Sequence, residues 1–475
     1  MMNRIGNKVV LVGLMVIALF LVSPKAEAKP LDYYGGVANE YEYEEVFFLT
    51  GYPINFKGKA TVTERESRGT ITTTYKFTLS SAAGDKLTRS VVYTTEVDDH
   101  ADKGQSTSQT SVKSYTEKVT IGKDWTYTLD DYQFSKGVVS DHRPASDYYS
   151  GNVIARKIYK VANRATKSEE LLTVNLTGRT MGYENFWGAT ETQIMEHHIV
   201  TASGREGFVT SKVSDSKSRV LEYEPNEPDL SSFKGGHAVI STSNMVSEYT
   251  YDLQYGSKGK IKLSQEMTPK IERLIVPKFR DLTYSSARED IEKLYSLGIY
   301  DESSQFFSPN TPMTRYQFAV GVLRGVDLRV LEEPKKTATK SIFKDVSIKD
   351  PNYRYIQSAV EKGVINGVTP DKFVPDGPIT RMQAVAIMMR SLGMEGRAPT
   401  PGYKLNFTDN GKIPAWGKDA VYVSTEIGLI QGDRNGRFNP DQPITRAEAS
   451  IIMVRFLNFL ENDLKQNYRE DIFFY

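Results

Sequence analysis

Two patterns of apolar and polar positions divide the chain. Up to about residue 270, apolar and polar residues alternate over short segments, as they do from Ile71 to Leu79. Successive side chains of an extended chain point to opposite faces, so this alternation predicts strands with one buried face. Polar turns such as Ala83-Gly84-Asp85 separate the segments. We therefore expect a β-rich N-terminal region over residues 29–270, folded as an antiparallel sandwich or barrel.

Beyond residue 278 the apolar period becomes helical and the pattern repeats three times. A Phe-x-Asp motif begins each repeat at Phe279, Phe343 and Phe407, with a spacing of 64 residues both times. The repeats cover residues 279–328, 343–394 and 407–460, and each contains two helical segments joined by a loop rich in Gly, Pro and Asp. One helix pair cannot bury its apolar face alone, so we expect the three repeats to pack together.

The second helix of each repeat is expected to begin at a Thr-Arg pair. The threonine and the residue three positions later, Gln or Glu, fit a capping box. The arginine then occupies the first helical position, where the helix dipole disfavours a cation. Its recurrence indicates another partner for the guanidinium. That partner is either the carboxylate of the Phe-x-Asp motif or an anionic group outside the protein, and the residues alone leave both alternatives open.

The third repeat carries the fullest set of landmarks: Phe407-Thr-Asp409, Trp416, Gly428, Gly432 and Thr445-Arg-Ala-Glu448. These residues resemble the S-layer homology (SLH) domain, and three copies are the usual number in that family. The resemblance implies an all-α, pseudo-threefold helical bundle, so the chain as a whole is expected to be multidomain. It also implies non-covalent binding to pyruvylated secondary cell wall polymer on the peptidoglycan of Gram-positive bacteria.

The resemblance further implies that the polymer lies in grooves between neighbouring repeats. The residues that it assigns to carbohydrate binding are Arg315, Arg381, Arg446, Asp281, Asp345, Asp409, Trp416, Gly367 and Gly432. The tryptophan position holds Ser286 and Pro351 in the first two repeats, so we expect one or two competent grooves. Because the third repeat keeps Trp416 and Gly432, we expect Arg446 to contribute more to binding than Arg315.

The N-terminus has the features of an export signal. Arg4 and Lys8 precede an uncharged stretch of 14 residues from Val9 to Val22, and Ala26-Glu27-Ala28 forms an A-x-A cleavage site. As a helix, this stretch would be about 21 Å long, which is short of the roughly 30 Å hydrocarbon core of a bilayer. We therefore expect residues 1–28 to be a signal peptide, and no membrane contact after cleavage following Ala28.

Composition narrows the remaining classes of function. The chain has no cysteine, and its 60 basic and 59 acidic residues leave a net charge of +1, which argues against a nucleic-acid partner. Adjacent residues of a strand face opposite ways, so His197 and His198 cannot share a metal. We expect no catalytic residue, metal or cofactor, and therefore a non-enzymatic secreted surface protein with S-layer or other surface proteins as further candidate partners. The alternatives are a wall-associated glycoside hydrolase or an adhesin in which the repeats only tether the β-rich region.

Overall fold

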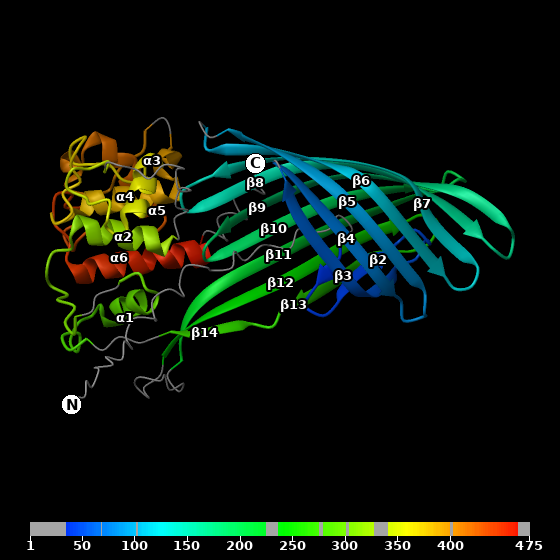
Figure 1. Cartoon of the computed structure of the whole chain (residues 1–475), viewed down its shortest axis with the longest axis horizontal. Coiled ribbons are helices and arrows are strands. Elements are labelled where there is room, and N and C mark those ends of the chain that lie inside the picture. The colour runs from blue at the N-terminus through cyan, green and yellow to red at the C-terminus, as the bar shows by residue number, and fades with distance from the viewer. Residues whose placement is uncertain are drawn as a thin grey trace, which may run out of the picture.

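The computed structural model describes residues 35–67, 69–100, 103–224, 236–274, 279–300, 304–326, 341–399 and 402–463. A large β-sheet formed by the N-terminal region lies beside a smaller group of helices formed by the C-terminal repeats (Figure 1). The expected leader, with its cleavage residues Ala26 and Ala28, lies outside the described residues. Within the described part of the chain, no helix has the length and apolar character needed to cross a membrane.

The N-terminal region forms one antiparallel sheet of 14 strands. Neighbours in sequence are neighbours in the sheet from β1 to β13, and β14 pairs with β12. The strands are β1 (Val37–Ala38), β2 (Tyr43–Phe47), β3 (Ile54–Ser67), β4 (Thr70–Ser80), β5 (Lys86–His100), β6 (Gln105–Ile121), β7 (Trp125–His142), β8 (Ser146–Asn163), β9 (Ser168–Asn185), β10 (Gly188–Val200), β11 (Glu206–Glu224), β12 (Gly236–Leu253), β13 (Lys258–Glu266) and β14 (Lys270–Leu274).

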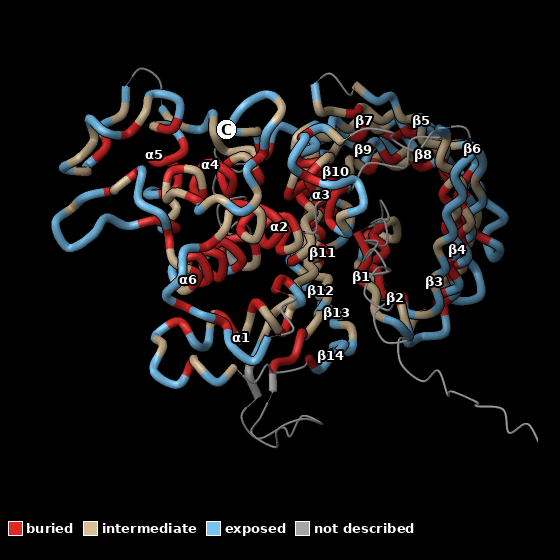
Figure 2. The backbone as a smooth tube through the Cα atoms, turned by 60° about the vertical axis from the view of Figure 1, so that its left-hand side comes forward, coloured by how far each residue is buried: buried red, intermediate tan, exposed pale blue. Residues whose placement is uncertain are grey.

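The sheet curls round so that its first and last strands approach each other (Figure 2). Side chains join them: Asn39 Nδ2 donates to Gln265 Oε1 at 2.8 Å, and Gln265 Nε2 donates to Glu44 Oε2 at 3.3 Å. Ser247 Oγ on β12 donates to the Gly35 carbonyl at 2.6 Å. Long twisted strands accumulate the rotation that rolls a sheet, and the result is barrel-like.

The fold class expected from the sequence is wrong as stated: the N-terminal region is barrel-like and not a sandwich, and the C-terminal part is not all-α. The N-terminal region is a single continuous sheet curled round its own core, whereas a sandwich would divide the strands between two sheets. Period-two alternation is the same in both architectures, and strand register decides between them.

The C-terminal part is small, and it is not an all-α bundle. Its helices are 9 to 13 residues long: α1 (Arg288–Ser296), α2 (Arg315–Gly325), α3 (Tyr353–Glu361), α4 (Arg381–Leu392), α5 (Lys418–Glu426) and α6 (Arg446–Asn458). Long loops and isolated β-bridges, such as that between Thr314 and Pro378, connect and join them. A 3-10 turn, η4 (Ala415–Gly417), precedes α5, and a π-helical turn, η5 (Phe459–Asp463), follows α6. The Gly- and Pro-rich segments between the helices account for the low helix content.

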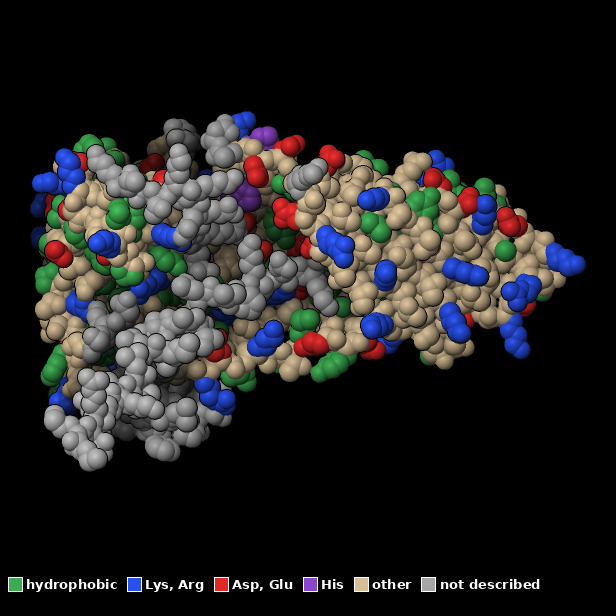
Figure 3. Space-filling view, in the orientation of Figure 1, with side chains coloured by type: hydrophobic (Ala, Val, Ile, Leu, Met, Phe, Trp, Pro, Cys, Tyr) green, Lys and Arg blue, Asp and Glu red, His purple; other side chains and the backbone are tan. Residues whose placement is uncertain are grey.

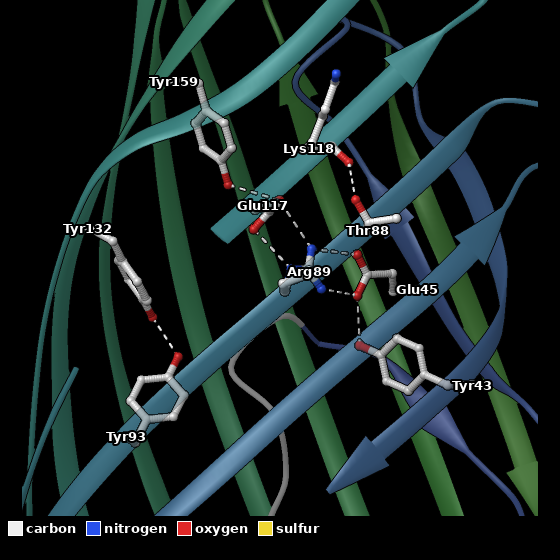
Figure 4. A network of polar contacts seen from close by, with 9 residues as sticks. All are labelled: Tyr43, Glu45, Thr88, Arg89, Tyr93, Glu117, Lys118, Tyr132 and Tyr159. Atoms are coloured by element: carbon white, nitrogen blue, oxygen red, sulfur yellow. Dashed lines mark hydrogen bonds and ion pairs between the residues drawn. The ribbon is translucent and has the colours of Figure 1, made fainter. Parts of the chain in front are cut away.

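A buried ion cluster ties strands together inside the barrel-like region (Figure 4). Arg89 on β5 donates from Nη1 and Nη2 to Glu45 on β2 at 2.7 and 2.8 Å, and from Nε to Glu117 on β6 at 2.9 Å. Tyr159 Oη donates to Glu117 at 3.2 Å. Burial acts to raise the pKa of Glu117, but Arg89, Lys157 and Tyr159 together hold it below its ordinary value. These charges satisfy one another within the core.

The two halves share one hydrophobic core. Trp187, in the β9–β10 turn, is 2 % exposed and packs among the buried side chains of the repeats. The sheet and its turns also bond to the C-terminal ends of α2 and α4 and to η5, the turn after α6. These bonds run from Trp187 Nε1 to the Gly325 carbonyl at 2.9 Å, from the Ala145 amide to the Ser391 carbonyl at 2.9 Å, and from Asn185 Nδ2 to the Leu460 carbonyl at 3.3 Å. The repeats therefore hold the sheet at or just beyond the ends of all three second helices.

Candidate functional site

The three Thr-Arg pairs begin α2, α4 and α6, and each threonine is the N-cap of its helix. The hydroxyl of Thr314 accepts from the Gln317 amide at 3.1 Å, and Thr380 and Thr445 make the corresponding bonds at 3.3 and 3.2 Å. The side chain of the third helical residue accepts from the capping amide in return, so all three predicted capping boxes are present. These caps place each arginine in the first turn, with its side chain directed out of the helix.

Backbone bonds join the three cap segments in a cycle. The Met313 amide donates to the Ile444 carbonyl at 2.9 Å, Ile444 donates to Ile379 at 3.1 Å, and Ile379 donates back to Met313 at 2.9 Å. Each repeat thereby contacts both of the others at one point. The three arginines consequently lie at the junctions between repeats.

Each arginine contacts the loop of the next repeat. Arg315 Nη2 donates to the Asn366 carbonyl and Arg381 Nη2 to the Gln431 carbonyl, while Arg446 Nε donates to the Phe307 carbonyl at 2.8 Å. The guanidinium carbons lie 4.9, 5.5 and 4.2 Å from the ring centroids of Phe373, Phe438 and Phe307, respectively. A junction thus combines an arginine from one repeat with the loop of another.

The aspartates of the Phe-x-Asp motifs bond to the backbone of their own loops. Asp345 accepts from the Phe373 and Val374 amides at 2.9 and 2.7 Å, and Asp281 and Asp409 make the equivalent pairs of bonds in their repeats. Burial opposes these amide bonds, but they still lower the pKa of Asp345. Val374 has φ of 59°, a conformation that is costly for a β-branched residue. The carboxylates therefore stabilise strained loops beside the junctions.

Gly367 and Gly432 directly follow the residues whose carbonyls receive an arginine. A Cβ on Gly367 would lie 2.2 Å from the Thr369 carbonyl oxygen, so no side chain fits there. A Cβ on Gly432 would lie 3.2 Å from the Phe407 ring. The structure therefore brings Gly367 together with Arg315, and Gly432 together with Arg381. The equivalent loop of the first repeat, residues 301–303, lies outside the described residues.

Trp416 belongs to the junction of Arg315. Its side chain is 55 % exposed on η4, and its ring centroid lies 5.9 Å from the guanidinium carbon of Arg390 on α4. Arg390 approaches the Asn366 amide side chain at 3.2 Å, and Arg315 bonds to the carbonyl of the same residue. We call the group Arg315, Asn366, Gly367, Arg390 and Trp416 the first junction; it takes residues from all three repeats.

The charge balance differs between junctions. Burial and the neighbouring Arg390 lower the pKa of Arg315. Among the residues that the structure describes, the buried Nε atoms of Arg315 and Arg381 both lack a hydrogen-bond partner. Burial and the neighbouring Arg455 also lower the pKa of Arg381, but Glu448, Asp433 and Asp409 oppose that effect. Glu395 bonds to Arg390 Nε at 2.8 Å, which leaves one cation of the first junction uncompensated. An exposed indole beside Arg390, whose guanidinium in turn neighbours Arg315, suits an anionic sugar, because the ring can stack on the sugar and the cations can bind its charge.

Sequence reasoning missed Arg390. It lies nine residues after Arg381, and Arg324 and Arg455 lie nine residues after Arg315 and Arg446. This recurrence was a usable signal, because a position that repeats in every unit points to a shared role. A cation in the last turn of a helix is also explained by the helix dipole, which makes the position easy to overlook.

Comparison with known proteins identifies the repeats. The S-layer homology domain model matches residues 278–319, 342–385 and 406–450, so the chain carries three such domains. An endoglucanase of Bacillus sp. (strain KSM-635) is 30 % identical over 159 residues, which cover 33 % of this chain and 16 % of the relative. The surface-layer 125 kDa protein of Lysinibacillus sphaericus is 26 % identical over 173 residues, or 36 % and 14 % of the two chains.

A cellulosome-anchoring protein of Acetivibrio thermocellus is 32 % identical over 96 residues, which cover 20 % of this chain and 21 % of that protein. This chain thus spans about a fifth or less of the length of these relatives. They include both a glycanase and surface proteins, and these partial matches do not extend the glycanase activity to this chain.

Proposed function

We propose that this chain, which carries three S-layer homology domains, is an exported cell-surface protein of a Gram-positive bacterium. The domains hold it non-covalently on secondary cell wall polymer, and the barrel-like region is displayed without catalysing a reaction. SLH domains bind wall polymers and anchor surface proteins. The surface-layer and cellulosome-anchoring relatives support the same role here.

The observation that carries the proposal is the pair of guanidinium groups at the first junction. Arg315 and Arg390 lie close enough for one to lower the pKa of the other, and Trp416 stands exposed beside Arg390. A carboxylate-bearing sugar, such as the pyruvylated residue expected of the family's ligand, would neutralise this charge and stack on the indole. Of the nine expected binding residues, the proposal gives direct contacts to Arg315, Gly367 and Trp416.

The other expected residues take different parts in the proposal. Arg381 and Gly432 form a second junction that contains nearby carboxylates and is weaker for an anion. Arg446 is as buried as Arg315, at 7 % exposed, but its Nε donates to the Phe307 carbonyl, so we assign it mainly to joining the third repeat to the first. Asp281, Asp345 and Asp409 shape the loops. In this assignment Arg315 contributes more to polymer binding than Arg446, which is the reverse of the order expected from the sequence.

The pairing of the interior charges supports display over catalysis. Arg89, Glu45 and Glu117 bond to one another, and their side chains are at most 3 % exposed. A glycosidase would instead present two carboxyl groups to its substrate across an open site. The hydrolase alternative predicts release of sugars from wall or plant polysaccharide, and the display proposal predicts none.

Sedimentation with purified cell walls tests the anchor. The mature full-length chain is mixed with walls that retain their secondary polymer and with walls from which acid has removed it. The proposal expects sedimentation with the intact walls only. Equal sedimentation with both preparations, or none with either, would rule out the polymer as the anchor.

A further inference from the structure

The outer face of the barrel-like sheet carries a group of unpaired lysines. Lys59 on β3, Lys76 on β4, Lys86 on β5 and Lys118 on β6 are all exposed. No ion pair to any of the four is found within the described part of the chain. In the space-filling view, Lys and Arg side chains gather over the part of the sheet remote from the helices (Figure 3). We call these four residues the lysine face.

Strand register places the four lysines close together. Lys59, Thr78, Thr88 and Lys118 are successive partners across the four strands, so the two lysines of this row lie about 14 Å apart. Lys76 and Lys86 lie two residues to either side of the row, next to Thr78 and Thr88 respectively. The lysine face is therefore a diamond of four cations whose diagonals are each about 14 Å.

Two carboxylates next to these lysines in sequence are turned away from this face, and Glu44 and Asp130, on the strands that flank it, are paired with Lys57 and Lys160. Glu117 precedes Lys118 but points inward to Arg89, while Lys118 points outward beside Thr88 (Figure 4). Asp85 precedes Lys86 and is 7 % exposed, with its carboxylate bonded to the Ser81 hydroxyl at 2.6 Å and the Gly122 amide at 2.8 Å. Burial of these acids leaves the cations unscreened, although the whole chain has a net charge of only +1.

The side chains between the lysines are small and hydroxylated. They are Thr61, Thr78, Ser80, Thr88, Ser90, Thr116 and Thr120. Single-stranded nucleic acid is bound through aromatic side chains on which bases stack, and protein interfaces are anchored by aromatic and methionine side chains. A lipid surface takes apolar side chains into its interface. Cations set among hydroxyl groups instead match a chain that carries both charge and hydroxyls.

We propose that the lysine face binds an acidic polysaccharide, through its carboxylate or phosphate groups and its sugar hydroxyls. This would be a second polymer contact, separate from the junctions between the repeats and independent of the anchor proposed above. It gives the displayed region a ligand class of its own.

Two variants with equal charge change test the proposal. The first carries Lys59→Gln, Lys76→Gln, Lys86→Gln and Lys118→Gln. The control carries Lys258→Gln, Lys262→Gln, Lys270→Gln and Lys349→Gln, which are also exposed but lie elsewhere. Both variants keep the SLH junctions, and equal melting temperatures would confirm that both fold. Binding of the full mature chain is measured to polygalacturonate, neutral dextran, single-stranded DNA and phosphatidylglycerol vesicles.

The parent and the control should bind polygalacturonate, and the first variant should bind it at least about tenfold more weakly. Dextran should not bind, and added salt should weaken the interaction because exposed charges are screened. Equal binding of polygalacturonate by the two variants, or no binding by the parent, would overturn the proposal. Tighter binding of the parent to DNA or to vesicles would replace the polysaccharide with that partner.

Discussion

The indole nitrogen of Trp187 donates a 2.9 Å hydrogen bond to the carbonyl oxygen of Gly325. The first residue belongs to the sheet and the second ends a helix of the first repeat. The bond lies in a core that contains side chains from both halves, so the sheet and the repeats are expected to unfold together.

Replacing Trp187 with Phe should remove this bond and leave the Gly325 carbonyl unsatisfied. We expect the free energy of unfolding to fall by about 1–3 kcal/mol, measured by denaturant titration. Trp125→Phe is the matched control, because Trp125 is 40 % exposed and should shift stability by no more than about 0.5 kcal/mol. Separate transitions for the two halves in the parent protein would contradict a shared core.

The Arg89 cluster should be costly to break. Arg89→Met leaves Glu45 and Glu117 buried without their main cation, and the free energy of unfolding should fall by about 3–5 kcal/mol. Lys258→Met, in an exposed pair with Asp252, should change it by no more than about 0.5 kcal/mol. Similar effects of the two substitutions in urea titrations would argue against an energetically important interior cluster.

The stability of the contact between the sheet and the repeats should depend on pH. Burial, with a smaller contribution from Glu222, raises the pKa of Glu461 from 4.5 to about 7, against the effect of Lys293. Between these pH values the folded chain holds a proton that the unfolded chain has lost. Stability due to Glu461 is therefore present below about pH 4.5 and is lost as the pH rises to about 7.

Melting temperatures measured from pH 4.5 to pH 8 would check this expectation. Glu461→Gln cannot lose a proton, so the difference between variant and parent should grow in favour of the variant as the pH rises. Glu448→Gln is the control, because this residue caps α6 away from that contact. A difference between Glu461→Gln and the parent that stays constant with pH would contradict the raised pKa.

The strained loop of the second repeat offers a stabilising substitution. Val374 has φ of 59° and is 39 % exposed, so glycine should relieve backbone strain without emptying the core. We expect Val374→Gly to raise the free energy of unfolding by up to about 1 kcal/mol. Val368→Gly, also exposed but without a positive φ, should lower it. Melting temperatures check this prediction, because Val374→Gly should melt above Val368→Gly. The opposite order would contradict it.

Substitution of Arg390 tests whether the first junction contributes more to polymer binding than the second. Arg390→Gln should weaken binding to purified wall polymer about tenfold, since it removes one charged contact at the first junction. Arg455→Gln is the matched control, because Arg455 occupies the same position of the third repeat near a junction that already contains carboxylates. A larger loss from Arg455→Gln, measured by calorimetry, would place the main site at the second junction.

The sequence predicted local features better than their combination. Capping at Thr314, Thr380 and Thr445 depends on residues three positions apart, and the structure has it in all three repeats. Which arginine meets which loop depends on the cyclic arrangement of the repeats, and linear spacing does not contain that information. Gly432 was therefore grouped with Arg446, whereas the structure places it with Arg381.

For the sheet, too, the sequence predicted local structure better than the overall arrangement. Alternation predicted strands within β4, β5 and β7 to β12, but the choice between one curled sheet and two packed sheets rests on register and twist accumulated over long strands. Trp187 joins the two halves, a role that requires the position of the repeats to be known.

Isothermal titration of the mature full-length chain with purified secondary wall polymer tests whether the arginine junctions recognise an anionic sugar. The polymer would be used intact and after mild acid has removed its anionic substituents. We expect saturable binding of the intact polymer and at least a tenfold loss of affinity with the treated polymer. Equal affinity for both would contradict recognition of an anionic sugar by the arginine junctions.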